Sequence, residues 1–438
     1  GVVHAAGFGT ADASGRPVDA DTPFLLGSVS KGITALAVSQ LAERGSIDLD
    51  APVRRYLPAF ALADAGASST ITVRQLLDQT SGIPTSAGVG PLSEPATTLE
   101  ARVHDLAGVA PVSVPGVAYH YSNANYVVLG RLVEVVSGES FEAYLQRHVF
   151  GPLGMDHASA DPGTSEADGL GDAHRLWFGL ADTHPPLDRA DLAPAGFVSA
   201  SANDVGRYLA ALLDPAGPGG GAVASPATVA SMFSGTAPTG IGDERYGLGW
   251  AETTYRGERI VAHAGSTTDM ASFVAIDPAR GVAIAVLFDA QSPLYELLHK
   301  PDQIGLGVLA QALGQAPDGT LEGFYPIVDI AFAVLLGLMA WRLVVLVRSP
   351  RAAGPSGPRR WWSRPRRIGG LALRGYLDVV VPIAILVAMP GFFGAGWPAL
   401  IRTDIGLVLA LVAMLRVADG AIRAWRWRLG FGSMGTAA

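Results

Sequence analysis

Apolar residues recur at helical spacing along much of the first 315 residues. In residues 29–44 they fall three and four positions apart, and the run stops at Gly45, as in a helix with a glycine C-cap. Ser140 and Asn203 stand where N-cap residues are expected before two further runs. Residues 158–195 are polar and lack this period. The pattern predicts helices over residues 29–44, 72–82, 125–138, 140–154 and 203–214.

After residue 258 the hydrophobic period changes to that of β-strands. Residues 259–265, 270–278 and 281–290 alternate or are rich in β-branched side chains, and Asp277-Pro278 with Arg280-Gly281 predicts a hairpin turn between the last two. Helical spacing returns in residues 294–314. We therefore predict an α+β fold with strands near both ends and helices between them. The first and last parts of one sheet would then enclose a helical insertion.

Beyond residue 326 polar positions become rare. Three apolar runs are long enough to cross a bilayer as helices, although Pro382 and Pro390 interrupt the second run, which could instead be re-entrant. The alternative, buried helices of a soluble protein, is disfavoured by their length and flanking charges. We predict a domain at residues 1–315, a linker at 316–326, and a membrane domain at 327–438 with spans at 327–347, 375–398 and 404–424.

The charge distribution predicts an orientation in the membrane. The net charge is −8, but residues 325–438 carry 14 arginines and four aspartates, so this part is basic and the front part is acidic. Eight of the arginines lie in the 348–374 loop, and arginine-rich loops stay cytoplasmic. We therefore expect this loop and the C-terminus in the cytoplasm, membrane lipid as a partner, and the front domain outside. The acidic front domain argues against nucleic-acid binding.

The composition also narrows the chemistry. The absence of cysteine excludes disulfides, thiolate metal sites and a cysteine nucleophile. The histidines lack metal-ligand spacing, so we expect neither a metal nor another cofactor. An exported domain needs a leader, and the stretch that begins at Gly1 has no apolar core of signal-peptide length. We therefore expect the leader and most of a first strand to precede Gly1.

One of the two lysines stands at the start of a predicted helix. Lys31 follows Ser28 by three residues, so the two side chains share a helix face. A serine hydroxyl becomes a good nucleophile when a base lies beside it, and a desolvated lysine can lose its proton near neutral pH. The helix N-terminus offers N–H groups to a developing anion. An N-cap serine beside a solvated lysine is the simpler alternative for this pattern taken alone.

Two further stretches supply groups for the same chemistry. Tyr121 and Asn123 precede a helix, where the phenol can relay a proton to a leaving group and the amide can hold a substrate carbonyl. His263 and Gly265 lie on a predicted strand. The backbone N–H of Ser266, which follows them, could form an oxyanion hole with that of Ser28.

With these three motifs in this order, the sequence resembles the serine β-lactamase and penicillin-binding-protein superfamily. It is most similar to the class C-like branch of esterases, D-aminopeptidases and D-alanyl-D-alanine carboxypeptidases. The motifs are Ser28-Val29-Ser30-Lys31, Tyr121-Ser122-Asn123 and His263-Ala264-Gly265, and the resemblance covers roughly residues 5–290. It implies an antiparallel β-lactamase/transpeptidase-like sheet. It also implies that Ser28 is acylated, that Lys31 activates it, and that Tyr121 is a general acid or base. Which of Lys31 and Tyr121 takes the first proton stays open.

Two positions depart from the pattern of that superfamily. The third motif is usually Lys-Thr-Gly in β-lactamases and carboxypeptidases, where its cation helps to bind a substrate carboxylate, but here it begins with His263. A histidine is mostly neutral at pH 7, which fits the esterase-like members better. Gln79 stands where a histidine is usual, in a segment that we expect to be structural.

The resemblance implies a membrane-anchored serine hydrolase outside the cytoplasm. Its substrate would be a small ester or a D-amino-acid amide or cell-wall peptide, cleaved through an acyl-enzyme. One alternative is a penicillin-binding carboxypeptidase or β-lactamase of the same fold. Another is an inactive hydrolase fold that serves as a membrane sensor or scaffold, which the complete Ser28, Lys31 and Tyr121 set disfavours.

Overall fold

The computed structural model describes most of the first 348 residues and a short segment near residue 415. The described residues are 1–87, 96–177, 180–187, 189–217, 223–292, 300–317, 324–348, 408, 410–419 and 421–422. The chain divides into two compact units. The first contains Gly1–Leu176 and Ala181–Thr320, and the second contains Trp177–Leu180 and Leu321–Ala438.

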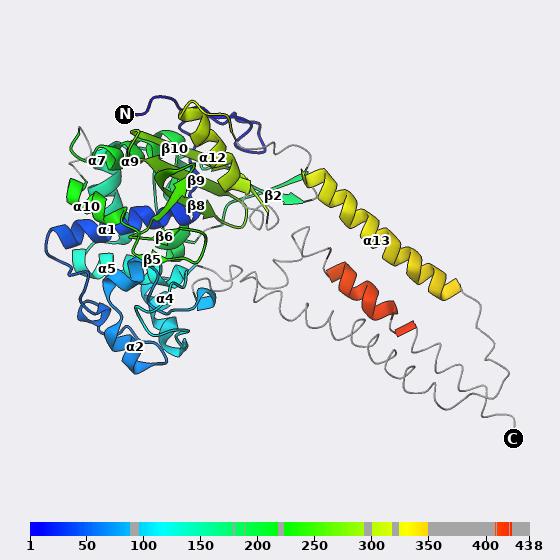
Figure 1. The fold of residues 1–438 in the computed structure, drawn as a ribbon, viewed down its shortest axis with the longest axis horizontal. Helices are drawn as coiled ribbons and strands as arrows, with labels where there is room; N and C mark the ends of the chain where they lie inside the picture. The colour runs from blue at the N-terminus through cyan, green and yellow to red at the C-terminus, as the bar shows by residue number, and fades with distance from the viewer. Residues whose placement is uncertain are drawn as a thin grey trace, which may run out of the picture. The chain divides into compact units, whose positions relative to one another are not determined.

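The first unit contains a helical body built around two buried helices, α1 and α5 (Figure 1). From Ser30 to Gln40 the residues of α1 are all buried, because the helix is apolar or small on every face. The helix α5 ends at Gly138, whose φ of 75° forms the expected left-handed C-cap. The helices of this unit are α1 (Ser30–Glu43), α2 (Ala65–Thr70), α3 (Val73–Leu77), α4 (Leu99–His104), α5 (Asn123–Ser137), α6 (Phe141–Leu145), α7 (Gly151–Leu153), α8 (Pro162–Ala167), α9 (Ala202–Leu213), α10 (Pro226–Met232) and α12 (Lys300–Ala312).

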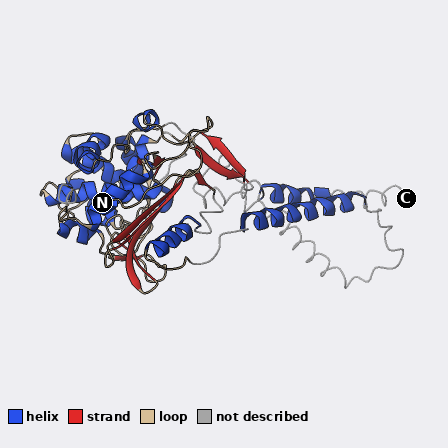
Figure 2. Ribbon diagram, turned by 90° about the horizontal axis from the view of Figure 1, so that it is seen from above, coloured by secondary structure: helices blue, strands red, loops and turns tan. Residues whose placement is uncertain are grey.

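A six-stranded antiparallel sheet lies between this helical body and α12 (Figure 2). Successive side chains of a strand point to opposite faces, so one face of the sheet packs against the helical body and the other against α12. Val261 and Val274 belong to the main core, whereas Ile260 and Phe273 pack in a second core with Leu309 of α12. The strand order is β10 (Val282–Phe288), β9 (Ala271–Asp277), β8 (Glu258–Ser266), β7 (Ala251–Tyr255), β6 (Arg245–Tyr246) and β5 (Ala237–Pro238).

The α+β fold with an antiparallel sheet is confirmed, and so is the hairpin, in which the Gly281 N–H donates to the Asp277 carbonyl. The prediction that one sheet encloses the helices was wrong for the described residues. There, β1 (Phe24–Leu25) pairs with β4 (Ser199–Ala200) in a separate ribbon, because the chain turns into the 3-10 segment η1 (Gly27–Val29) after only two extended residues. A third sheet has the order β11 (Ala290–Gln291), β2 (Ala173–Trp177) and β3 (Leu180–His184).

Two local predictions also need correction. Ser140 caps α6 as expected, but the cap of α9 is Ser201 and not Asn203. Ser201 accepts a hydrogen bond from the Asp204 N–H while the Asp204 carboxylate accepts one from the Ser201 N–H, which completes a capping box. Residues 158–195, which we expected to be irregular, contain α8, β2 and β3. We did not predict β2 and β3 because they are short and polar, with five residues each.

In the second unit, α13 (Phe324–Arg348) is a 25-residue helix that coincides with the first expected span. Arg342 on α13 forms an ion pair of 2.9 Å with Asp419. Among the described residues, no helix combines the length and the apolarity needed to cross a membrane. The expected span at 375–398 and part of the one at 404–424 lie outside the described residues. The structure therefore does not support the first expected span at 327–347, and the three-span arrangement stays a prediction from the sequence.

Candidate active site

Ser28 lies in a tight turn that is held against the sheet. The turn is the 3-10 segment η1 (Gly27–Val29), which leads directly into α1. Gly27 has a φ of 52°, and a Cβ at this position would lie 2.3 Å from the backbone nitrogen of Ser266 on β8. Only glycine allows both this backbone conformation and this approach. The turn that contains Ser28 and the Ser266 amide are therefore held side by side, as an oxyanion hole requires.

The three residues expected to carry the chemistry meet at Ser28. Lys31 Nζ lies 2.9 Å from Ser28 Oγ, and the Tyr121 hydroxyl lies 2.7 Å from the same oxygen. Lys31 Nζ also lies 4.8 Å from the centre of the Tyr121 ring. The helix α1 brings Lys31 to Ser28, and the segment before α5 brings Tyr121 from 93 residues away.

Lys31 is completely buried, whereas Ser28 is partly exposed. Burial lowers the pKa of Lys31 well below its ordinary value, since it penalises the charged form. Besides Ser28, its nitrogen contacts Asn123 Oδ1 at 2.7 Å and the Ala195 carbonyl oxygen at 2.6 Å. Asn123 thus holds Lys31 through Oδ1 in this structure, and the expected contact of its amide with substrate stays a prediction. Ala195 had no predicted role, although it lies in the Pro-Ala-Gly-Phe stretch at residues 194–197, which contributes to the resemblance.

Gln79 holds the Tyr121 segment in place, in line with the structural role expected for its segment, although the sequence did not indicate its partners. Its side-chain oxygen accepts hydrogen bonds from the Ser122 N–H at 2.9 Å and from Asn125 Nδ2 at 2.5 Å. Its carbonyl accepts another from the His120 N–H at 2.8 Å. Gln79 is buried and has a φ of 63°, which is unusual for a residue with a side chain. The replacement of the usual histidine by Gln79 was the feature of the sequence that could have indicated this role.

The third motif lies on β8, beside the turn that contains Ser28. The Gly265 position has no room for a side chain, because a Cβ there would lie 2.0 Å from the Leu26 carbonyl oxygen. Ser272 of β9 donates a hydrogen bond of 2.6 Å to that same carbonyl, and Gln291 donates one of 3.1 Å to Ser266 Oγ. These two contacts, which the sequence did not suggest, fix the expected oxyanion hole to the sheet.

His263 is buried and has partners for both ring nitrogens. Nδ1 lies 2.7 Å from the Ala264 carbonyl oxygen, and Nε2 lies 2.9 Å from the Tyr246 hydroxyl. Burial, together with the nearby Lys31, lowers the pKa of His263 to about 4. The ring is therefore uncharged at neutral pH, and the expected contact between His263 and substrate stays a prediction.

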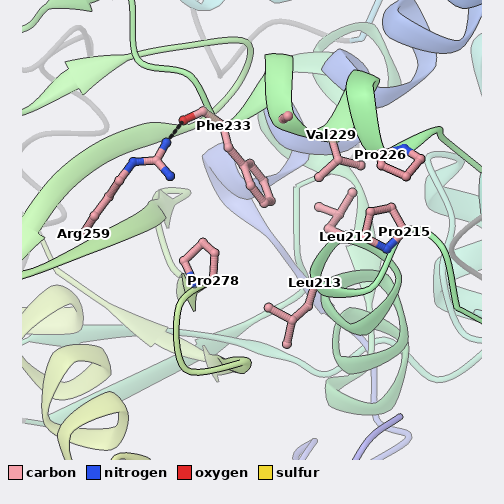
Figure 3. Close-up of a pocket in the computed structure, with 9 residues that line it drawn as sticks. Leu212, Leu213, Pro215, Pro226, Val229, Phe233, Arg259 and Pro278 are labelled. Carbon is pink, nitrogen blue, oxygen red and sulfur yellow. Dashed lines mark hydrogen bonds between the residues drawn. The ribbon is translucent and has the colours of Figure 1, made fainter.

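A separate cavity of about 280 Å³ lies between α9, α10 and the β9–β10 hairpin (Figure 3). Its lining is mainly apolar, and the Arg259 guanidinium on one side donates to the Phe233 carbonyl at 2.8 Å and pairs with Glu252. None of its lining residues belongs to the Ser28 group. Within the described ranges, no group of three or more His, Cys, Asp or Glu side chains could hold a metal ion.

Sequence comparisons agree with this geometry. A family model described as Beta-lactamase matches residues 1–308. The chain is 33% identical to Penicillin-binding protein 4 of Amycolatopsis lactamdurans over 285 residues, which are 63% of this chain and 74% of that protein. It is 27% identical to Protein flp of Staphylococcus aureus over 285 residues. This match covers 62% of this chain but only 53% of Protein flp. The chain thus spans about half the length of this second relative.

Solved structures show the same fold. The octameric penicillin-binding protein homologue from Pyrococcus abyssi is 27% identical, with a TM-score of 0.62, over 77% of this chain and 75% of that one. A D-stereospecific amidohydrolase from Streptomyces sp. is 24% identical, with a TM-score of 0.52, over 62% of this chain and 83% of that one. The second likeness concerns the fold alone.

Proposed function

The chain belongs to the β-lactamase family, and on this premise we propose that it is a serine hydrolase that forms an acyl-enzyme at Ser28. The observation that carries the proposal is the position of Ser28 Oγ, which lies 2.9 Å from Lys31 Nζ and 2.7 Å from the Tyr121 hydroxyl. A partly exposed hydroxyl between a buried amine and a phenol is the arrangement that nucleophilic catalysis needs.

In the proposed reaction, Lys31 is the base that takes the proton of Ser28. A neutral amine can donate two N–H groups, to Asn123 Oδ1 and the Ala195 carbonyl, and still direct its lone pair at Ser28 Oγ. The lowered pKa of Lys31 supports the neutral form at working pH. This argument favours Lys31 over Tyr121 for the first proton transfer.

The remaining steps follow from the other groups. Ser28 Oγ attacks the acyl carbon, and the oxyanion accepts hydrogen bonds from the Ser28 and Ser266 N–H groups. The Tyr121 hydroxyl gives its proton to the leaving group, and water then hydrolyses the acyl-enzyme with the same groups acting in reverse. Each role uses an atom that lies beside Ser28 or in the strand held against its turn.

For the substrate, we propose an ester or a D-amino-acid amide or peptide with an uncharged group near the third motif. The neutral His263 supports this choice, because it offers no fixed positive charge to a carboxylate. The second candidate is a penicillin-binding carboxypeptidase or β-lactamase, which the 33% identity to Penicillin-binding protein 4 favours. An inactive scaffold is disfavoured, because such a protein has no need for the buried Lys31.

We expect the purified full chain to turn over short-chain esters faster than cephalosporins. The reason is that productive binding of a cephalosporin carboxylate would lack a cationic partner at His263. The measurement is kcat/KM for a p-nitrophenyl ester and for a chromogenic cephalosporin under the same conditions.

The contrary outcome is equally clear. If the cephalosporin is favoured tenfold, a difference of about 1.4 kcal/mol in transition-state binding, the second candidate replaces the first. A Ser28→Ala variant serves as the background for both substrates, and labelled penicillin distinguishes slow turnover from no binding.

We further propose that the C-terminal part anchors the enzyme in a membrane, with the hydrolase domain outside the cytoplasm. The support comes from the sequence, in the apolar runs at 327–347, 375–398 and 404–424 and in the arginine-rich 348–374 loop. The role of the anchor would be to keep the enzyme near substrates at the cell surface.

A single-cysteine scan tests this orientation, because the chain has no cysteine of its own. Cysteine at the exposed Ser69 should react with an impermeant maleimide in intact cells, whereas cysteines at Ser356 and Ser433 should react only after lysis. Reaction of Ser356→Cys in intact cells would contradict the orientation. Reaction of Ser433→Cys alone would contradict only the number of spans.

A further inference from the structure

The two hydrogen bonds of His263 define the proton positions on its ring. A carbonyl oxygen can only accept, so the contact of 2.7 Å with the Ala264 oxygen requires a proton on Nδ1. In the neutral ring, Nε2 then has a lone pair and no proton. The Tyr246 hydroxyl, 2.9 Å away, must therefore be the donor to Nε2.

Tyr246 is built into this position. It lies at the end of β6, is 2% exposed, and its ring stands edge-on to that of His263 at 5.7 Å between centres. The Tyr119 and Tyr121 rings pack against it at 5.7 and 6.2 Å. An aromatic cluster that includes catalytic Tyr121 thus holds the Tyr246 hydroxyl beside His263.

Few charges face this pair. Lys31 from α1 lies nearby, and its charged form opposes protonation of His263. The hydroxyl of Tyr126 from α5 also interacts with Tyr246. It donates its own proton to the Leu77 carbonyl at 2.7 Å, so its oxygen is a second acceptor for the Tyr246 proton, in competition with His263 Nε2. Burial raises the pKa of Tyr246 well above its ordinary value, so this phenol remains a donor throughout the working pH range. No carboxylate among the described residues shifts the pKa of His263.

We propose that Tyr246 is a positioning residue that holds His263 in the Nδ1-protonated neutral form with no free ring nitrogen. The third motif then presents an uncharged ring that neither attracts a substrate carboxylate nor becomes charged in mild acid. This inference rests on the proposed function and deepens it. In this proposal, the Tyr246–His263 pair sets the preference for a neutral leaving group. The preference should therefore change when Tyr246 is replaced, with Ser28, Lys31 and Tyr121 left intact.

The first test is spectroscopic and needs no substrate. Histidine-selective ¹⁵N NMR of the full chain, with the His263 signals assigned by a His263→Gln variant, reports which nitrogen carries the proton. We expect the Nδ1-protonated form from pH 8 down to about pH 5. In Tyr246→Phe, protonation of His263 should become at least about tenfold more favourable, which is one pKa unit. An Nε2-protonated ring in the wild type, or an unchanged titration in the variant, would overturn the proposal.

A matched control separates this effect from the loss of any buried hydroxyl. Tyr208 is also buried, and its hydroxyl has no hydrogen-bond partner among the described residues. Tyr208→Phe therefore removes the same atom from another buried position and should leave the His263 titration unchanged. An equal shift in both variants would mean that Tyr246 has no specific role. If Tyr246→Phe does not fold, an Nε2-protonated ring in the wild type still overturns the proposal.

The second test is kinetic. It uses a D-alanyl anilide and the same anilide with a carboxylate on the leaving ring, each from pH 5 to 8. In the wild type the ratio of their kcat/KM values should be constant. In Tyr246→Phe the charged substrate should gain about fivefold or more toward pH 5, as His263 becomes protonated. A constant ratio in that variant would contradict the specificity role. If neither anilide is cleaved by the wild type, the amide part of the proposed function fails instead, and the NMR result still tests the role of Tyr246.

Discussion

Replacing Ser28 with alanine is expected to lower kcat by roughly 10⁴-fold or more. Nucleophile and base act as a unit, so removal of the nucleophile leaves only what binding and the oxyanion hole contribute. The alanine side chain also leaves Lys31 and Tyr121 without the oxygen that they share at 2.9 and 2.7 Å. The loss should therefore appear in kcat, with folding and substrate binding largely retained.

The measurement combines ester kinetics with covalent labelling by a fluorophosphonate, which should be lost in Ser28→Ala. Ser39 provides the matched control, since it lies on the same helix and its buried hydroxyl has no partner among the described residues. Ser39→Ala should keep both activity and labelling. Labelling that survives in Ser28→Ala, or that maps to another serine, would remove Ser28 from its assigned role.

Replacing Lys31 with arginine is expected to be nearly as damaging as replacing it with alanine, with kcat/KM reduced roughly 10³-fold or more in both. Arginine keeps the positive charge but cannot lose its proton at working pH, so it has no lone pair to offer Ser28. Its larger head must also enter the space where Lys31 is completely buried against Asn123 and Ala195.

Lys300 is the only other lysine in the sequence, and Lys300→Arg is the control for the exchange itself. The unfolding temperatures of both Lys31 variants show whether activity is lost because the protein is unfolded. If Lys31→Arg retains substantial activity, positive charge alone is needed at this position, and Tyr121 becomes the better candidate for the base. In the wild type, kcat/KM should fall as the pH drops and Lys31 becomes protonated, because the base is then lost.

The sequence by itself determined the features that depend on short stretches of chain. The spacing of Ser28 and Lys31 places them on one helix face, because a helix brings residues three apart together wherever it forms. The strand alternation of β8, β9 and β10, the turn at Gly281 and the cap at Gly138 were likewise predictable from local composition. The order of the three motifs indicated which distant segments would meet, through resemblance rather than through physics.

The tertiary structure decided the contacts that join segments far apart in the chain. The Ala195 carbonyl reaches Lys31 across 164 residues, and Ser272 reaches Leu26 across 246. Gln79 and Tyr246 gained their roles in the same way, by lying beside Ser122 and His263 after folding. Spacing along the chain says nothing about such neighbours, since they depend on how whole elements pack. The charge state of Lys31 and His263 depends on the same packing, because only complete burial makes their charged forms unfavourable.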